Sequence, residues 1–210
     1  MPQTTICYKV LGPDGECFHG GQGTWELAQD GEPGPWMPRI RGKLIPCKRG
    51  YHVLRAEHLL YWLGPAIHRV EAEEPILWDD YKGVCRRARD LGRIEAWNER
   101  TARLYAADCA EHVLYLYEAA YPDDDRPRHA IEIGRRYANG QATSDELLSA
   151  YTSVEEAALA DTRTAGVAVA AWAVTDTGAA FAAREAALRA TLAVAARAIT
   201  DTGAAWAVTR

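Results

Sequence analysis

The sequence predicts an α+β protein of two unlike halves, a small sheet-rich domain at residues 1–95 and an all-helical domain at residues 96–210. Residues 1–95 hold 12 of the 17 glycines and 8 of the 10 prolines, which divide this half into short segments. Residues 94–120 contain neither glycine nor proline, and residues 151–210 hold 22 alanines, the residue with the highest helix propensity. The change of composition near residue 95 therefore predicts a domain boundary.

Short strands separated by turns are expected in the first half. Residues 6–11 are rich in β-branched and aromatic side chains and stop at the turn sequence Gly12-Pro13-Asp14-Gly15. Residues 67–72 alternate between two faces, as a strand does, whereas residues 56–63 have helical spacing and end at Gly64-Pro65. Further strands are expected at residues 44–47, 51–53 and 76–78, and loops at residues 20–23 and 30–35.

Three helices are predicted in the second half. The first lies within residues 94–120, and the second spans residues 126–138, with Asp125 as N-cap and Asn139-Gly140 as stop signal. The third begins at a capping box of Thr143 and Glu146 and extends to about residue 161. In the first helix, three- and four-residue spacing predicts one apolar stripe made of Tyr105, Cys109, Val113, Leu116, Tyr117 and Ala120.

The alanine-rich tail contains one internal repeat. Residues 174–180 recur as residues 199–205, which suggests a helix-turn-helix unit used twice. A solenoid needs at least three repeats, so the repeat does not predict one.

Composition excludes several classes of protein. The net charge is -5, from 24 basic and 29 acidic residues, and this argues against an obligate nucleic-acid binder, whose affinity depends on neutralising phosphates. We expect no membrane span, because no apolar run approaches the roughly 20 residues that a bilayer requires. No secretory signal is visible, and the five cysteines form no CxxC pair, so reduced thiols in a cytoplasm are expected. No motif predicts a cofactor or a metal.

Each candidate binding residue in the first half has both a functional and a structural interpretation. His52 follows the turn Cys47-Lys48-Arg49-Gly50-Tyr51, and is either an acid–base or ligand-binding residue or a hydrogen-bonded structural histidine; the sequence favours the second. The glycine-rich run 18–23 lacks the ending of a P-loop and is interpreted as a flexible surface loop. Trp25 and Trp36, at loop positions, are the candidates for exposed tryptophans on a binding surface.

Candidate residues in the second half lie on and after the first predicted helix. Cys109 and His112 stand three residues apart beside Asp108 and Glu111, but no later helix supplies a matching ligand pair, so a metal site is not predicted. The run 123–128 concentrates charge in one loop. It is interpreted either as a solvated helix cap or as a docking surface for a partner, and both stay open. The residues assigned to docking are Asp123, Asp124, Asp125, Arg126 and Arg128.

Two families resemble parts of the chain. The stretch from Trp97 to Leu114, followed by residues 122–132 and 135–140, resembles the Imm-5-like putative immunity protein domain of polymorphic toxin systems; the resemblance extends over about residues 96–210. It implies an all-helical fold, a protein partner and no catalytic residues. Residues 5–95 resemble a phage and bacterial domain of unknown function, the DUF7666 type, through short motifs that include the run 47–52, and this resemblance implies no known activity.

Three hypotheses of function follow. The first is non-catalytic recognition of a protein, such as a basic toxin that is steered by the acidic excess of the second half. The second is an NAD- or nucleotide-using enzyme, because the order of elements in the first half is similar to that of ADP-ribosyltransferase-like folds; His52 and Tyr81 are its catalytic candidates. The third is a structural or phage assembly component that oligomerises through alanine-rich helices anchored by Trp172 and Trp206.

Overall fold

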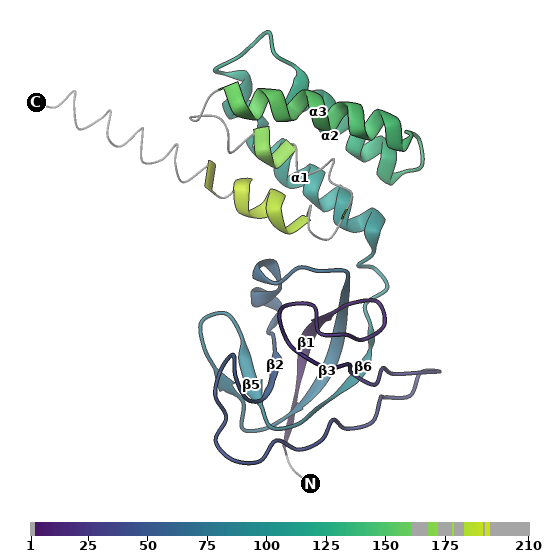
Figure 1. Ribbon diagram of the computed structural model, residues 1–210, viewed down its shortest axis with the longest axis vertical. Coiled ribbons are helices and arrows are strands. Elements are labelled where there is room, and N and C mark those ends of the chain that lie inside the picture. Colours follow the sequence, from purple (N-terminus) through teal and green to yellow (C-terminus); the bar gives the residue numbers. More distant parts are fainter. Residues whose placement is uncertain (1–2, 161–167, 172–177, 179–182, 191, 194–210) are drawn as a thin grey trace, which may run out of the picture. The chain divides into compact units, whose positions relative to one another are not determined.

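The computed structural model describes residues 3–160, 168–171, 178, 183–190 and 192–193. Contacts within the chain divide it into two compact units, Met1–Asn98 and Glu99–Arg210 (Figure 1). Strands lie between residues 4 and 93, and helices follow from residue 99, so the predicted α+β class is confirmed. The repeat at 174–180 and 199–205, Gly178 excepted, lies outside the described residues, as do Trp172 and Trp206.

Two three-stranded antiparallel sheets form the N-terminal unit. The first has the strand order β1-β3-β6 and the second the order β2-β5-β4. A short 3-10 helix, η1 (Ala56–Tyr61), stands where a longer helix over 56–63 was expected. The strands are β1 (Thr4–Leu11), β2 (Tyr51–Val53), β3 (Ala66–Glu73), β4 (Leu77–Trp78), β5 (Gly83–Cys85) and β6 (Ala88–Arg93).

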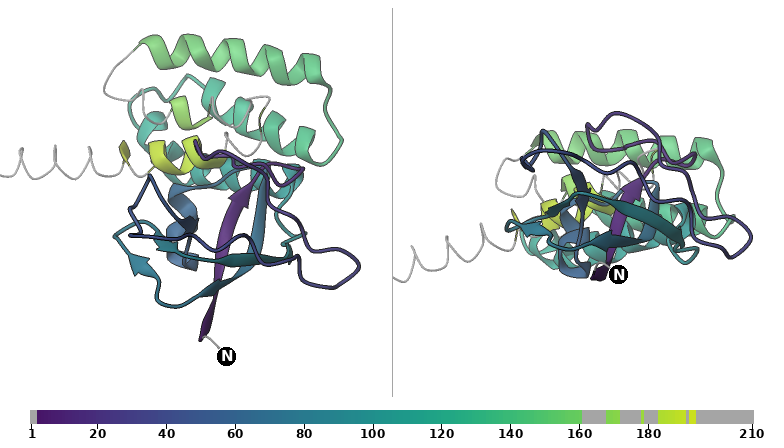
Figure 2. Two further views of the ribbon diagram at one scale, coloured as in Figure 1. Left: turned by 60° about the horizontal axis from the view of Figure 1, so that its bottom comes forward. Right: turned by 90° about the horizontal axis from the view of Figure 1, so that it is seen from below.

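The longest pairing joins β1, the strand that starts at the N-terminus in Figure 2, to β3. Cys7 faces Val70 in this pairing, and Leu11 faces Ala66. One core cluster collects buried side chains of both sheets and of the loop between β1 and β2. Its buried members are Cys7, Leu11, Trp25, Val53, Val70, Ala72, Ile76, Cys85 and Ala88.

The prediction of a strand at residues 44–47 is wrong. An isolated bridge between Ile45 and Arg49 closes a turn there, and Cys47 has a φ of 61°, which a strand does not allow. Strands β5 and β6 were not predicted. Strand β5 has three residues, and β6 lacks a regular alternation of apolar and polar side chains, so neither carries a strong local signal. The partner strands β2 and β3 are distant in sequence.

Three long helices lie in the described part of the C-terminal unit, and α2 packs against both α1 and α3. They are α1 (Glu99–Glu118), α2 (Arg126–Ala138) and α3 (Ser144–Ala160). Residues 168–171 and 183–190 are helical as well. The predicted stripe on α1 is partly wrong, because only Val113 and Tyr117 of its six members are buried and Ala120 is exposed. The rest of the buried face consists of four alanines, at positions 102, 106, 107 and 110, together with Arg103 and Leu114.

The predicted capping box at the start of α3 is confirmed. The Thr143 amide donates to Glu146 Oε2 at 2.7 Å, and the Glu146 amide donates to Thr143 Oγ1 at 3.2 Å. The two side chains thus satisfy backbone amides that the first helical turn leaves unpaired.

Replacing Thr143 by alanine is therefore expected to lower the free energy of unfolding of the C-terminal unit by about 1 kcal/mol. Urea unfolding followed by circular dichroism at a helix wavelength measures the change. Thr152→Ala is the matched control, since Thr152 is exposed and its hydroxyl donates only to the Leu148 carbonyl one turn earlier. An equal loss in both variants would contradict a role for the cap.

No helix in the described part of the chain combines the length and the apolar character that a bilayer crossing needs.

Candidate functional site

The charged loop between α1 and α2 is organised around Asp124. Arg126 donates from Nε to Asp124 Oδ1 at 2.8 Å and from a terminal nitrogen to Oδ2 at 2.6 Å. The hydroxyl of Tyr117, on α1, donates to the same carboxylate at 2.7 Å. Hydrogen bonds from Arg126 hold the pKa of Asp124 well below its usual range, and Tyr117 and the charge of Arg126 act in the same direction. Asp124 and Arg126 are thus partners of each other.

Asp125 does not cap α2 as predicted. It occupies the N-cap position, but its side chain makes no capping hydrogen bond. The Arg126 amide donates instead to Asp124 Oδ1 at 3.2 Å, so Asp124, and not Asp125, accepts a backbone hydrogen bond at the start of α2. Pro127 lies in the first turn, where its missing N–H costs nothing.

Two carboxylates of this loop face solvent without a partner. Asp123 and Asp125 are exposed, and neither side chain makes a hydrogen bond or an ion pair with the described residues. Arg128 is exposed as well, but its Nε donates to Glu118 Oε1 at 2.7 Å. The five residues assigned to docking therefore differ: within the described part of the chain, only Asp123 and Asp125 have charges that no other side chain pairs.

Most other charges on the described helices are paired with each other. Arg135, on α2, donates to Asp108 and to Glu111 of α1, at 2.6 Å each. Cys109 is half-buried, and burial raises the pKa of its thiol. No cluster of three metal-ligating side chains occurs in the described residues, so the arrangement around Cys109 and His112 offers no metal site there.

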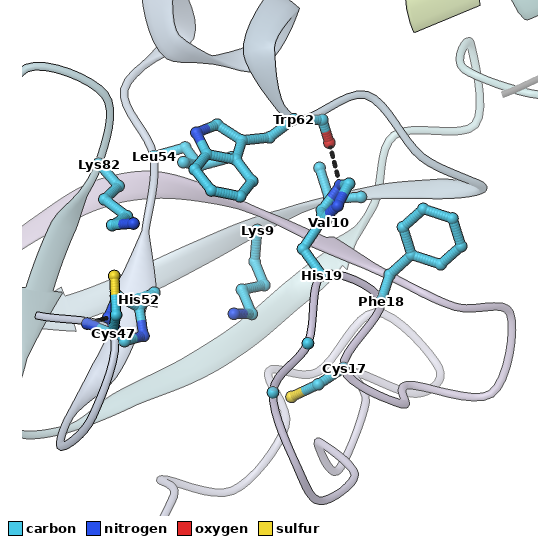
Figure 3. Close-up of a pocket in the computed structure, with 12 residues that line it drawn as sticks. Lys9, Val10, Cys17, Phe18, His19, Cys47, His52, Leu54, Trp62 and Lys82 are labelled. Carbon is cyan, nitrogen blue, oxygen red and sulfur yellow. Dashed lines mark hydrogen bonds between the residues drawn. The ribbon is translucent and has the colours of Figure 1, made fainter. Parts of the chain in front are cut away.

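His52 lies on a cavity of about 290 Å³ in the N-terminal unit (Figure 3). The turn before it requires glycine at position 50, where φ is 136° and a Cβ would lie 2.3 Å from Val84 Cγ2. This turn directs His52 on β2 toward the cavity, beside Cys47. The lining side chains that can carry charge are Lys9, Cys17, His19, Cys47, His52 and Lys82.

The imidazole of His52 is held by the backbone. The Cys47 amide donates to its Nε2 at 2.8 Å, so Nδ1 carries the proton of the neutral ring. Burial lowers the pKa of His52, and the positive charges of Lys9 and Lys82 lower it further. The partner of this ring is a backbone amide, which matches the structural interpretation of His52, while the cavity gives the same ring access to a ligand.

Tyr81 is not brought to this cavity. It is exposed, its ring lies edge-on to that of Tyr61 with centroids 4.9 Å apart, and its amide donates to Asp79 Oδ1 at 2.9 Å. The pairing of His52 with Tyr81 as catalytic candidates therefore finds no geometric support.

The glycine-rich run 18–23 contributes one wall of the cavity. Phe18, His19, Gly20 and Gly21 line it, and His19 Nε2 donates to the Trp62 carbonyl at 2.7 Å (Figure 3). The run is exposed, as expected for a surface loop, but this hydrogen bond attaches it to the end of η1.

The prediction of exposed tryptophans at positions 25 and 36 is wrong. Trp25 is 3% exposed and belongs to the core cluster. Trp36 is half-buried, with the guanidinium groups of Arg87 and Arg89 over its ring at 5.0 and 4.9 Å. These cation–π contacts cover the Trp36 ring, and the sequence did not predict them.

Comparison with known proteins finds one family model that matches part of the chain. Residues 92–176 match the family model described as Imm-5 like putative immunity protein. The match starts within β6 and includes α1, α2 and α3, and therefore both free carboxylates of the α1–α2 loop. Neither a curated protein nor a solved structure gives a significant match to the chain.

Proposed function

We propose that the helical unit is a non-catalytic binding module that recognises a protein partner in the manner of an immunity protein. The observation that carries this proposal is the match of residues 92–176 to the Imm-5 like family. Binding of this kind requires a preformed surface and no chemistry. A helix, α1, that buries four alanines and is linked to α2 through Arg135 supports such a preformed surface.

We assign the docking edge to the α1–α2 loop. Asp123 and Asp125 are exposed and unpaired in the described part of the chain, whereas Asp124 and Arg126 hold the loop in place. Charges of one sign favour a partner of the opposite sign, and a loop that is already held in place costs less ordering when the partner binds. The net charge of -5 comes from residues 96–210, which carry 11 basic and 16 acidic residues. The partner that fits this edge is a basic protein, such as a toxin.

Reversing the two free charges is expected to weaken the complex. The partner is first captured on the full chain and identified by mass spectrometry, and its dissociation constant is then measured with pure proteins by calorimetry. Asp123→Lys with Asp125→Lys should raise the dissociation constant at least about tenfold, which corresponds to roughly 1.4 kcal/mol. The loss should shrink at high salt, because these charges are exposed.

The matched control carries the same change of net charge elsewhere on the unit. Asp145→Lys with Glu155→Lys alters two exposed carboxylates of α3, and should change the dissociation constant less than about threefold. An equal loss in both double variants would mean that net charge alone matters. No loss in the loop variant would place the docking surface on another part of the unit.

A further inference from the structure

The cavity beside His52 is strongly basic. Two of the chain's four lysines, Lys9 and Lys82, line it together with His19 and His52, and no carboxylate of the described residues lines it. Residues 1–95 as a whole carry 13 basic and 13 acidic residues, so the excess of positive charge is local to the cavity. We propose that this cavity binds the phosphate group of a small molecule between the ammonium groups of Lys9 and Lys82, with His52 beside it.

Lys9 occupies a position where the fold would otherwise place an apolar residue. Side chains two residues apart on a strand share a face, so Lys9 lies on the same face of β1 as Cys7 and Leu11. Both neighbours are fully buried members of the core cluster. A lysine at such a position conflicts with the local pattern, and conflicts of this kind concentrate at functional sites.

The ammonium of Lys9 has no anionic partner in the described residues. Its recorded contact is the ring of Trp25, with the nitrogen 5.5 Å from the ring centroid. Burial lowers the pKa of Lys9, which reflects the cost of holding its charge away from water. Lys9 is half-buried, and a charge held partly away from water is ordinarily paired, so a bound anion would supply the missing pair.

Lys82 and His52 place further positive or proton-donating groups on the same cavity. The Lys82 ammonium lies over the ring of Trp62, 4.9 Å from its centroid, and makes no ion pair with the described residues. The nearby carboxylate of Asp79 accepts hydrogen bonds from the amides of Tyr81 and Lys82 and does not line the cavity. His52 carries its proton on Nδ1 in the neutral form and can donate it.

Charge and size both favour a phosphate. A phosphate monoester has a charge of about -1.5 to -2 near pH 7, which two ammonium groups match. Lysine binds phosphate as a point charge and needs no planar geometry. At about 290 Å³ the cavity also exceeds what a single phosphate group fills, and Phe18 and Trp62 give it an apolar side. A small organic phosphate therefore fits better than a free ion.

Calorimetric titration of the full chain tests the proposal. The probes are inorganic phosphate and AMP, with succinate as a dianion that has no phosphate. We expect AMP to bind with a dissociation constant below about 1 mM and inorganic phosphate more weakly. Absence of binding by both phosphates, or equally tight binding of succinate, would overturn the proposal.

A lysine series locates the site. Lys9→Met keeps the apolar stem and removes the charge, and it should weaken AMP at least about tenfold; Lys82→Met should weaken it several-fold. Lys43→Met makes the same change of charge at an exposed position away from the cavity and should leave the affinity unchanged. Unaltered affinity in Lys9→Met would overturn the proposal.

The stability of Lys9→Met distinguishes a ligand site from a structural lysine. If Lys9 serves a ligand, removing its half-buried charge should leave the N-terminal sheets as stable as before, or more so. Hydrogen exchange of the β1 and β3 amides gives this readout and also shows that the variant is folded. Faster exchange in Lys9→Met would instead show that Lys9 stabilises the fold through its contact with the Trp25 ring.

Discussion

Replacing Asp90 by alanine should destabilise the N-terminal unit by about 3 kcal/mol, because it breaks a buried pair and leaves the other member unpaired. Asp90 is 1% exposed and His68 is 3% exposed. His68 Nδ1 donates to Asp90 Oδ1 at 3.0 Å, and the Ala28 amide donates to Asp90 Oδ2 at 2.8 Å. One carboxylate thus joins β3, β6 and the loop that carries Ala28.

The other imidazole nitrogen increases the cost of this substitution. Nε2 of His68 is buried and has no hydrogen-bond partner among the described residues, so the bond to Asp90 is the one that compensates for burying the ring. Burial acts to raise the pKa of Asp90, but the hydrogen bonds from His68 and from the Ala28 and Gly92 amides outweigh it and hold the pKa below its ordinary value. The carboxylate is therefore charged at neutral pH.

Hydrogen exchange of β3 and β6, followed by mass spectrometry, measures the effect in the full chain. Asp80→Ala is the control, since Asp80 is an exposed carboxylate of the same unit. It should change the free energy of unfolding by less than about 0.5 kcal/mol. A loss below about 1 kcal/mol in Asp90→Ala would show that water or a rearranged loop replaces the carboxylate.

The fold could be predicted wherever the signal is local. Absence of glycine and proline located α1, and α2 ends at the residue that the Asn139-Gly140 signal indicated. The Thr143–Glu146 box located the start of α3 because both partners lie within one turn. Strands β5 and β6 could not be found in this way, because β5 pairs with β2 and β6 pairs with β3, and both of these partners are distant in sequence.

The candidate sites show the same limit. The cluster at residues 123–128 is visible in sequence, but which of three consecutive aspartates turns toward Tyr117 depends on where α1 places that hydroxyl. His52 was found, whereas Lys9 and Lys82 were not. For Lys9 a signal existed: it stands between Cys7 and Leu11 in a strand that was correctly predicted, and a charge at such a position could have been noted.

Asp124→Ala should separate the structural carboxylate of the α1–α2 loop from the two proposed to bind. We expect the free energy of unfolding of the C-terminal unit to fall by about 2 kcal/mol, because the substitution removes charge-assisted hydrogen bonds from Arg126 and leaves the Tyr117 hydroxyl without its acceptor. Asp123→Ala should change it by less than about 0.5 kcal/mol, since Asp123 is exposed. Hydrogen exchange of α1 and α2 amides in the full chain measures both.

The loss of unfolding free energy in Asp124→Ala should be larger at neutral pH than in acid. The pKa of Asp124 is lower in the folded chain than its ordinary value of about 3.9, so its ionised form stabilises the fold. That contribution is complete above about pH 5 and is lost as the pH falls below 4 toward the lowered pKa. Wild type and Asp124→Ala should therefore differ most at neutral pH and converge in acid. If the two free energies of unfolding differ by the same amount at every pH, the loss comes from packing around Tyr117. The charge of the Asp124 carboxylate would then contribute nothing to the stability of the unit.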